Sequence, residues 1–419
     1  MELLVAPVDG PVDAAPTLAV TGVPPGTPVT LTIRTTDAAG HPWCSSGRYP
    51  VRPDGSLQLD DPERPWWDMR FDDLDAVPVA FTAPDSALDY RVSVSCASGS
   101  TECVVRRVWN SGDDRTDLSG DGWSMRIYRP SGTAEPRAGV LIVPGSTGMS
   151  AIAPTAGLLA THGYTAGVLG YMQEPGLPPS FRRIPVEAIT AGMRAFTADS
   201  RVDANRVAVL AASVGAAAAL TSLSGDDTPR IRGVVAVSPT HVVWQALGTG
   251  GPPPRASMLT RDGQDLPYVP IRGDKLIGQM LRNAFTRRLS RQPRSAALRM
   301  LPAYAASLAR EDAVTRAALP VERIAAPLLA IAGTDDAMWP SATMAEALIQ
   351  RRRAHDAGDG DRLLLLPGAG HFMRPPITPT TVDRNDALIS GGTPHGVAHG
   401  QRTAWDATLE FLARATHNT

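Results

Sequence analysis

The chain has 419 residues, of which 43% are hydrophobic and 20% are charged, and its formal net charge at pH 7 is −2. This length exceeds the usual size of one hydrophobic core, so one large domain or two unequal domains are expected. The small net charge provides no general attraction to nucleic acid or to an anionic membrane, and neither is expected as a partner.

The sequence has no signal-peptide pattern and no apolar run approaching about 18 residues, so a soluble, cytoplasmic protein is expected. Three cysteines, Cys44, Cys96 and Cys103, are too few for a disulfide framework. Cys96 and Cys103 could pair across a hairpin, but reduced thiols fit a cytoplasm better. Lys275 is the only lysine, a bias typical of a GC-rich, bacterial genome.

Short runs with a period of two mark roughly the first 110 residues. They include TLAVTGV, PVTLTIRTTD and YRVSVSC, separated by turn signals such as PPGT and RPDG. This pattern predicts a small, all-β, immunoglobulin-like sandwich domain over residues 1–125. Trp66 and Trp67 lie in an acidic stretch of this region. They either cap the sandwich core, which we favour, or form part of a recognition surface.

The pattern over residues 126–419 changes to continuous apolar runs that alternate with helical ones. Expected strands are AGVLIVPG, YTAGVLGY, RVAVLA, IRGVVAVS, APLLAIAG and RLLLLPG. This alternation predicts an α/β domain with a mainly parallel sheet and helices on both faces. Because ligands of such sheets bind beyond the carboxyl ends of the strands, reactive residues at those ends are candidates for function.

The run VAVLAASVGAAAAL, at residues 207–220, contains one hydroxyl side chain, that of Ser213. One interpretation is a buried strand followed by an alanine-rich packing helix. The other is a sharp strand–turn–helix that presents a nucleophilic serine, for which the residues two before and two after must be small. Ala211 and Gly215 meet this requirement, although glycine is commoner at the first position. The segment alone does not decide between the two.

Two further residues follow strands and could complete a catalytic set. Asp336, in AIAGTDDAMWPS, is a candidate acid that would orient an imidazole, and its neighbour Asp335 is the rival. His371, in LLLLPGAGHFMRPP, stands on a glycine-flanked loop and is a candidate general base. Each of these residues taken alone could equally be an ordinary turn or surface residue.

The glycine-rich segment PGSTGMS, residues 144–150, follows the first strand of the α/β region. Its backbone N–H groups, with that of Val214 after the serine, could stabilise an oxyanion, and we favour Ser146 as the donor. The order Ser213, Asp336, His371, with this loop upstream, is the order of an α/β-hydrolase fold, so the catalytic interpretation of Ser213 is preferred.

Three stretches resemble the acyl-CoA thioesterase and bile acid-CoA:amino acid N-acyltransferase family of the α/β-hydrolase superfamily. They are LPVERIAAPLLAIAGTDDAMWPS, LLLLPGAGHFMRPPITPT and GGTPHGVAHGQRTAWDATLEFL. The resemblance is strongest over residues 319–412 and weak in the β-rich region. It implies a β-sandwich domain before an α/β-hydrolase domain, with Ser213 as nucleophile, Asp336 as acid and His371 as base.

Members of this family with serine are chiefly thioester hydrolases, whereas the amino-acid-conjugating members have cysteine, so Ser213 favours transfer of the acyl group to water. We expect an enzyme acting on acyl-CoA thioesters, with no metal or cofactor beyond a coenzyme A substrate. The alternatives are an acyltransferase or ester-processing enzyme of bacterial secondary metabolism with the same three residues, and a binding protein without turnover. Sequence does not indicate the oligomeric state.

The region of about residues 251–318 departs from the family pattern and is rich in arginine. It is predicted to be a helical insert that caps the hydrolase site. Arg282, Arg287 and Arg288 could bind the phosphates of coenzyme A, because guanidinium groups match phosphate oxygens, or they could lie on a solvated helix face.

Overall fold

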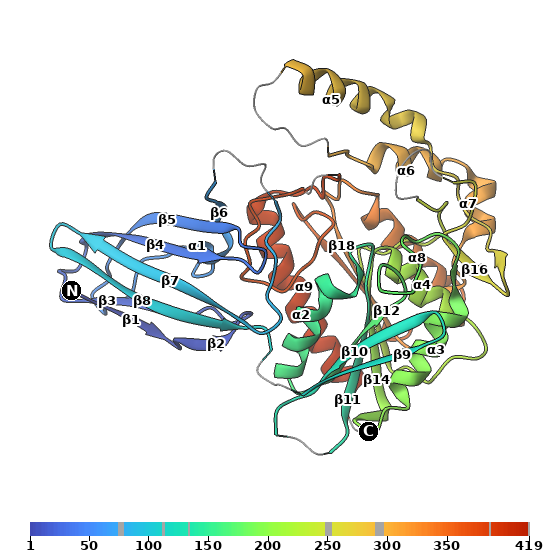
Figure 1. The fold of residues 1–419 in the computed structure, drawn as a ribbon, viewed down its shortest axis with the longest axis horizontal. Helices are drawn as coiled ribbons and strands as arrows, with labels where there is room; N and C mark the ends of the chain where they lie inside the picture. The colour runs from blue at the N-terminus through green and yellow to red at the C-terminus, as the bar shows by residue number, and fades with distance from the viewer. Residues whose placement is uncertain are drawn as a thin grey trace.

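The computed structural model of the protein consists of a β-rich N-terminal part and a larger α/β part (Figure 1). It describes residues 1–73, 79–110, 114–132, 135–247, 254–289, 297–384 and 387–417.

An eight-stranded sheet forms the centre of the α/β part, in the order β19-β18-β15-β14-β11-β12-β10-β9. The six strands from β19 to β12 pair in parallel, and β10 and β9 are antiparallel. Continuous apolar runs form the central strands because both of their faces are buried. The strands are β9 (Arg115–Gly120), β10 (Trp123–Tyr128), β11 (Arg137–Val143), β12 (Thr165–Gly170), β14 (Val202–Ala212), β15 (Gly233–Val237), β18 (Leu328–Gly333) and β19 (Arg362–Leu366).

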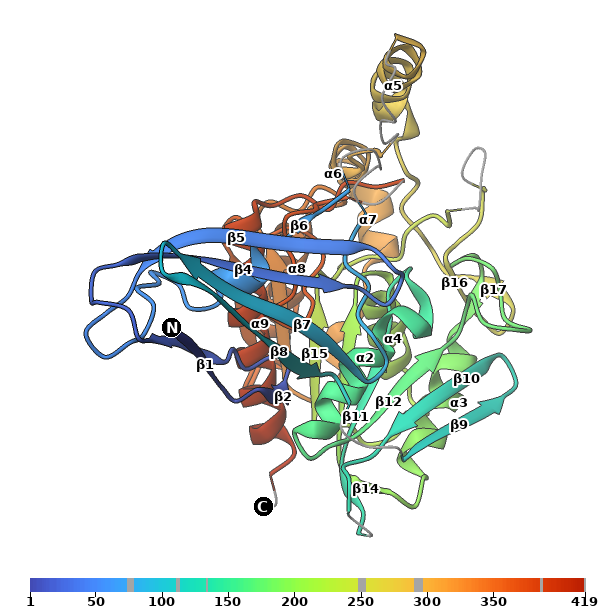
Figure 2. The same ribbon diagram turned by 60° about the vertical axis from the view of Figure 1, so that its left-hand side comes forward.

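Helices cover both faces of this sheet, as the sequence pattern predicts (Figures 1 and 2). One face packs against α2 (Gly148–Thr161) and α9 (Pro394–Ala415). The other packs against α3 (Val186–Thr197), α4 (Val214–Leu223) and α8 (Ser341–Ala354). Within the described part of the chain, no helix has the length and apolar character needed to cross a membrane.

The N-terminal part contains a six-stranded sheet, β2-β8-β7-β4-β5-β6, and a two-stranded sheet, β1-β3, which share one apolar core. Trp66 and Trp67 are buried, in agreement with the packing interpretation. The immunoglobulin-like topology stays a prediction. The elements are β1 (Glu2–Ala6), β2 (Asp9–Pro11), β3 (Thr17–Thr21), β4 (Pro28–Thr36), β5 (Pro42–Pro50), α1 (Arg64–Trp67), β6 (Arg70–Phe71), β7 (Ala87–Cys96) and β8 (Gly99–Val108).

The two parts are joined by a continuous core and by buried polar contacts. Asp13 of the N-terminal part accepts a hydrogen bond from Trp405 of α9 at 2.7 Å and lies 2.6 Å from His162, at the end of α2. Strand β9 already pairs with β10 in the eight-stranded sheet, although it precedes the boundary expected near residue 125. Its residues alternate in exposure, as an edge strand does, and this pattern resembles that of the N-terminal strands.

The segment between β15 and β18 is not purely helical, which corrects the expectation of a helical insert. Strand β16 (Leu259–Arg261) pairs with β13 (Ile184–Pro185) and with β17 (Gln264–Asp265). The β16–β17 hairpin turns at Asp262-Gly263, both with positive φ, which is a typical two-residue turn. The helices are η1 (Gly273–Leu276), α5 (Ile277–Leu289), α6 (Leu301–Leu308), α7 (Glu311–Ala317) and η2 (Val321–Arg323).

A buried ion pair stabilises the end of the sheet next to α8. Arg352 is fully buried, and its Nε lies 2.7 Å from Asp361, which also accepts a hydrogen bond from the N–H of Leu328 at the start of β18. The other guanidinium nitrogens donate to the carbonyls of Val321, Ile324, Ala326 and Ala357. One side chain therefore joins α8, η2 and the loop before β19.

The variant Arg352→Ala should lower the free energy of unfolding by about 3–5 kcal/mol, because it leaves the buried Asp361 without its partner. Urea denaturation monitored by circular dichroism measures this change. Arg353→Ala is the matched control: its side chain is exposed on the same turn, and its effect should stay within about 0.5 kcal/mol. Equal losses for the two variants would contradict the assignment.

Candidate active site

Ser213 lies at the sharp turn between β14 and α4. Its backbone has φ 55° and ψ −126°, a conformation that non-glycine residues rarely adopt. The N–H of Ser213 donates to the carbonyl of Val237, at the end of β15, at 2.9 Å. The strained residue is thus held by the neighbouring strand, and its hydroxyl stands beyond the carboxyl edge of the sheet.

Close packing explains why the neighbours of Ser213 are small. A Cβ on Gly215 would lie 2.2 Å from the carbonyl oxygen of Pro144, and one on Gly145 would lie 3.1 Å from the Cβ of Ser213. Ala211 is completely buried in β14. The alanine-rich run therefore fits both interpretations from the sequence, because the same residues pack the core and make the turn possible.

The three predicted side chains meet at the carboxyl edge of the sheet. His371 Nε2 lies 2.9 Å from Ser213 Oγ, and His371 Nδ1 lies 2.7 Å from Asp336 Oδ2. An ionised carboxylate only accepts hydrogen bonds, so Nδ1 carries the proton and Nε2 is free to accept from the serine hydroxyl. This arrangement can take a proton from Ser213 and return it to a leaving group.

Asp336, rather than its neighbour Asp335, is the carboxylate that reaches the histidine. Its Oδ1 accepts hydrogen bonds from the N–H groups of Met338 (2.7 Å) and Trp339 (3.2 Å), which leaves Oδ2 for the imidazole. Asp335 is exposed, and its carboxylate accepts a bond from Thr334. The turn thus orients one carboxylate inward and the other toward solvent.

A later segment, which the sequence interpretation did not include in the site, holds the acid and histidine loops together. The carbonyl of Ser390 accepts hydrogen bonds from the N–H groups of His371 (2.9 Å) and Ala337 (3.1 Å). A Cβ on Gly391 would lie 2.1 Å from the Asp335 carbonyl oxygen, and one on Gly370 would lie 2.2 Å from that of Gly391. The glycine pair in GGTPHG is the sequence signal for this approach.

Ser238 and Trp339 also position His371, and the sequence interpretation missed both. Ser238 Oγ donates to the carbonyl of His371 at 2.7 Å, and Trp339 Nε1 donates to the Ser238 carbonyl at 3.2 Å. The Trp339 ring meets the imidazole edge to face, with centroids 5.5 Å apart. The available signal was the position of Ser238 directly after β15.

The two predicted oxyanion donors are Val214, which directly follows Ser213, and Ser146, in the loop after β11. Ser146 is half-buried and follows Gly145, which packs against the serine. Val214 is the first residue of α4, so its N–H has no acceptor within the helix. The hydroxyl of the buried Tyr171 donates to the carbonyl of Pro144 at 2.6 Å and supports this loop. The role of the two N–H groups stays a prediction.

Of the three arginines predicted to bind phosphate, only Arg282 has a described side chain, and no contact among the described residues brings it to Ser213. Arg282 is exposed on α5. The side chains of Arg287 and Arg288 lie outside the part of the structure that is described.

A different arginine stands near the histidine. A small pocket of about 80 Å³ is lined by residues that include Thr147, Gly370, Phe372 and Arg374. Arg374 donates to the carbonyl of Phe81 at 2.9 Å, and burial lowers its pKa. This pocket therefore places a cation next to the His371 loop.

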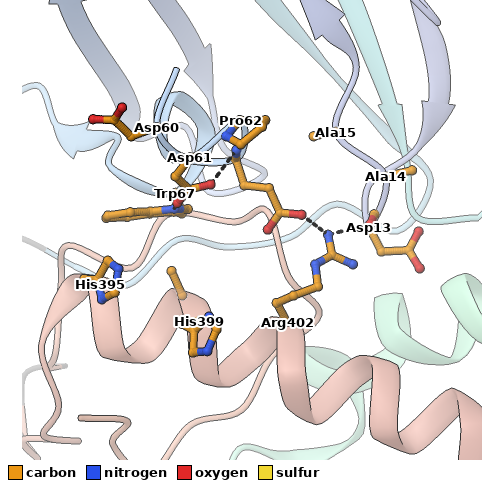
Figure 3. A pocket seen from close by; sticks show the side chains of 12 residues that line it. Asp13, Ala14, Ala15, Asp60, Asp61, Pro62, Trp67, His395, His399 and Arg402 are labelled. Atoms are coloured by element: carbon orange, nitrogen blue, oxygen red, sulfur yellow. Dashed lines mark hydrogen bonds and ion pairs between the residues drawn. The ribbon is translucent and has the colours of Figure 1, made fainter. Parts of the chain in front are cut away.

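A larger pocket, of about 680 Å³, lies between α9 and the N-terminal part, away from Ser213 (Figure 3). Trp67 donates to Asp61 at 2.8 Å at its rim, and Arg402 pairs with Glu63. His395 and His399 line it from α9, with nearly parallel rings. Because the ion pair between Arg402 and Glu63 joins the two parts at this pocket, we regard it as part of their interface.

Comparison with known proteins agrees with the family resemblance. Residues 281–418 match the family described as BAAT / acyl-CoA thioester hydrolase C terminal, a region that contains Asp336 and His371. The chain is 23% identical to the peroxisomal succinyl-coenzyme A thioesterase of Mus musculus, covering 96% of this chain and 93% of that protein. It is 21% identical to acyl-coenzyme A amino acid N-acyltransferase 1 of Mus musculus, covering 99% and 97%.

Among solved structures, the chain is similar to a dienelactone hydrolase-like phosphotriesterase from metagenomic libraries. The identity is 15%, the TM-score is 0.43, and the match covers 73% of this chain and 98% of the other.

The relatives indicate that the protein is an enzyme, and its larger part is an α/β fold with a mainly parallel sheet covered by helices on both faces. The more specific resemblance stated from the sequence is confirmed as a resemblance, since residues 281–418 match the model of the BAAT / acyl-CoA thioester hydrolase C-terminal family and nearly the whole chain aligns with two of the relatives above.

The variant Gly215→Ala should lower the free energy of unfolding by about 1–3 kcal/mol, and with it the melting temperature, because its Cβ would overlap backbone carbonyl oxygens. Gly278→Ala is the control: it lies in α5 with no atom near its added Cβ, and it should be neutral or slightly stabilising. Thermal unfolding measures both. A neutral Gly215→Ala would show that the turn is not tightly packed.

Proposed function

We propose that the protein is a serine hydrolase that cleaves acyl thioesters, with Ser213 as nucleophile, His371 as general base and Asp336 as the acid that orients the histidine. The observation that carries this proposal is the continuous hydrogen-bonded chain from Ser213 Oγ through His371 to Asp336. The strained backbone of Ser213 supports it, because such strain is typical of functional turns.

The reaction begins when Ser213 Oγ attacks the acyl carbonyl carbon while His371 Nε2 takes the hydroxyl proton. The oxyanion of the tetrahedral intermediate is held by the backbone N–H groups of Ser146 and Val214. The intermediate collapses, the C–S bond breaks, and the imidazolium returns the proton to the thiolate. Water then attacks the acyl carbon while His371 takes one of its protons, the bond between the acyl carbon and Ser213 Oγ breaks, and His371 returns the proton to Ser213 Oγ as the carboxylic acid leaves.

The substrate class rests on the relatives. A thioesterase and an N-acyltransferase that both act on coenzyme A substrates align with nearly the whole chain, which supports an acyl-CoA or closely related thioester. Arg282, Arg287 and Arg288 stay candidates for the phosphates of that substrate. The half-buried guanidinium of Arg374 is a further group that favours an anionic substrate. Cytoplasmic location and a bacterial source stay expectations.

The second candidate is acyl transfer to an amine or alcohol, favoured by the N-acyltransferase relative. The two reactions share the acyl-enzyme and differ only in the acceptor. Incubation of one acyl-CoA with and without glycine, taurine or simple alcohols, followed by mass spectrometry of the products, distinguishes them. Release of the free acid alone supports hydrolysis, and formation of a conjugate between the acyl group and the added acceptor supports transfer.

The variant Ser213→Ala should lose turnover of acyl-CoA by about 10⁴-fold or more while its unfolding transition is unchanged, since the side chain is small and the turn is kept. A fluorophosphonate probe should label the wild-type protein at Ser213, as found by peptide mass spectrometry, and should leave the variant unlabelled. Near-normal turnover by Ser213→Ala would refute the proposal.

The pair Asp336→Ala and Asp335→Ala provides a matched test of the acid. Asp336→Ala should reduce kcat by about 10⁴-fold, because His371 loses the group that sets its tautomer and orientation. Asp335→Ala should reduce it by less than about threefold, since its exposed carboxylate does not reach the imidazole. The reverse ranking would assign the acid to Asp335.

A further inference from the structure

Helix α5 exposes an unusual concentration of large apolar side chains. Ile277, Met280, Leu281 and Phe285 are 53%, 55%, 67% and 65% exposed. Their spacing of three and four residues places them on one face of the helix. Isolated apolar residues on a surface need no explanation, but four within nine residues form a continuous patch, which we call the α5 apolar face.

The orientation of α5 is the reverse of that of an ordinary surface helix. Its attachment to the rest of the protein is polar: the amide of Gln279 donates to the carbonyl of Arg299 at 2.9 Å and accepts from the Arg299 N–H at 3.0 Å. Asn283, one turn later, donates to the Ala297 carbonyl at 3.5 Å. At about 100° per residue, these two side chains lie opposite the apolar face.

The charge of this region is strongly one-sided. From Lys275 to Arg310 the sequence contains seven arginines and no aspartate or glutamate, although the whole chain has a net charge of −2. The expectation of no membrane partner came from the charge of the whole chain. A local excess of arginine beside an exposed apolar face is the pattern of helices that lie on anionic membranes.

The position of α5 suits an extended, flat partner. Both views place α5 at the outer edge of the molecule, beyond α6 and away from the two large sheets (Figures 1 and 2). A planar surface could therefore reach α5 from outside the molecule.

We propose that α5 attaches the protein to anionic lipid surfaces, with the α5 apolar face inserted among the acyl chains and the positive charge of this stretch of sequence attracted to the lipid phosphates. A second copy of the chain is disfavoured as the occupant, because two such regions would bring like charges together. The α5 apolar face does not depend on the catalytic role of Ser213, so lipid attachment would hold whether or not Ser213 is the nucleophile. In this proposal, the charge of Arg282 serves lipid phosphates instead of those of coenzyme A.

Attachment through α5 would also set the direction in which the catalytic site faces the lipid. The ring of Tyr304, on α6, meets that of Trp339 at 5.6 Å, and Trp339 meets that of His371 at 5.5 Å. Helix α6 thus lies between the α5 region and the histidine. Attachment through α5 would turn this side of the α/β part toward the lipid, where acyl compounds gather.

Co-sedimentation of the full chain with large unilamellar vesicles tests the proposal. At low salt, vesicles of phosphatidylcholine mixed with phosphatidylglycerol should bind the wild-type protein. The affinity for vesicles of phosphatidylcholine alone should be lower by about tenfold or more. The double variant Leu281→Asp/Phe285→Asp should lose at least about tenfold of the binding to the mixed vesicles. Raising the salt should weaken wild-type binding.

Val8→Asp is the matched control, because Val8 is 52% exposed but lies in the N-terminal part, and it should bind as the wild type does. Circular dichroism and thermal unfolding check that each variant is folded. Absence of binding to the mixed vesicles, or full binding by the folded double variant, would overturn the proposal. A dimer in light scattering that the double variant converts to a monomer would assign the face to a second copy instead.

Discussion

The turn at Ser213 is the constraint on which the rest of the site depends. Strand β14 enters helix α4 through one residue of positive φ, Ser213, and the loop after β11 passes directly over the start of that helix. Gly215 makes that passage possible, because any side chain there would overlap the carbonyl of Pro144. The same approach brings Gly145 next to the serine, so a single steric requirement shapes both the nucleophile turn and the loop beside it.

The acid and the base depend on a second close approach, farther along the chain. Asp336 and His371 follow neighbouring strands, but strand order alone does not hold two loops in register. The carbonyl of Ser390 does so by accepting a hydrogen bond from each loop, and Gly391 allows its backbone to come that near. Because these contacts are buried and made by backbone atoms, they determine the distance from His371 to Asp336 more firmly than side-chain packing would.

The outer elements add properties that the sheet itself does not provide. The N-terminal part shares a core with α2 and α9 and closes one side of the α/β part, and charged and apolar side chains together line the pocket between them. The segment between β15 and β18 contains α5, which lies at the outer edge of the molecule with its apolar residues exposed. A thioesterase attached through α5 would meet amphiphilic acyl compounds at a lipid surface, which unites the two proposals without making either depend on the other.

The sequence by itself determined the main strands and helices of the α/β part, because continuous apolar runs have few alternatives to a buried strand, and it identified Ser213, Asp336 and His371 as candidates. It also placed Ala211 and Gly215 around a sharp turn. The sequence also favoured Asp336 over its neighbour Asp335, and the tertiary structure showed the physical difference between them: Asp336 reaches His371, whereas Asp335 is exposed. Only the tertiary structure revealed Ser238, Ser390 and the outward apolar face of α5, because these depend on contacts between distant segments that periodicity does not record.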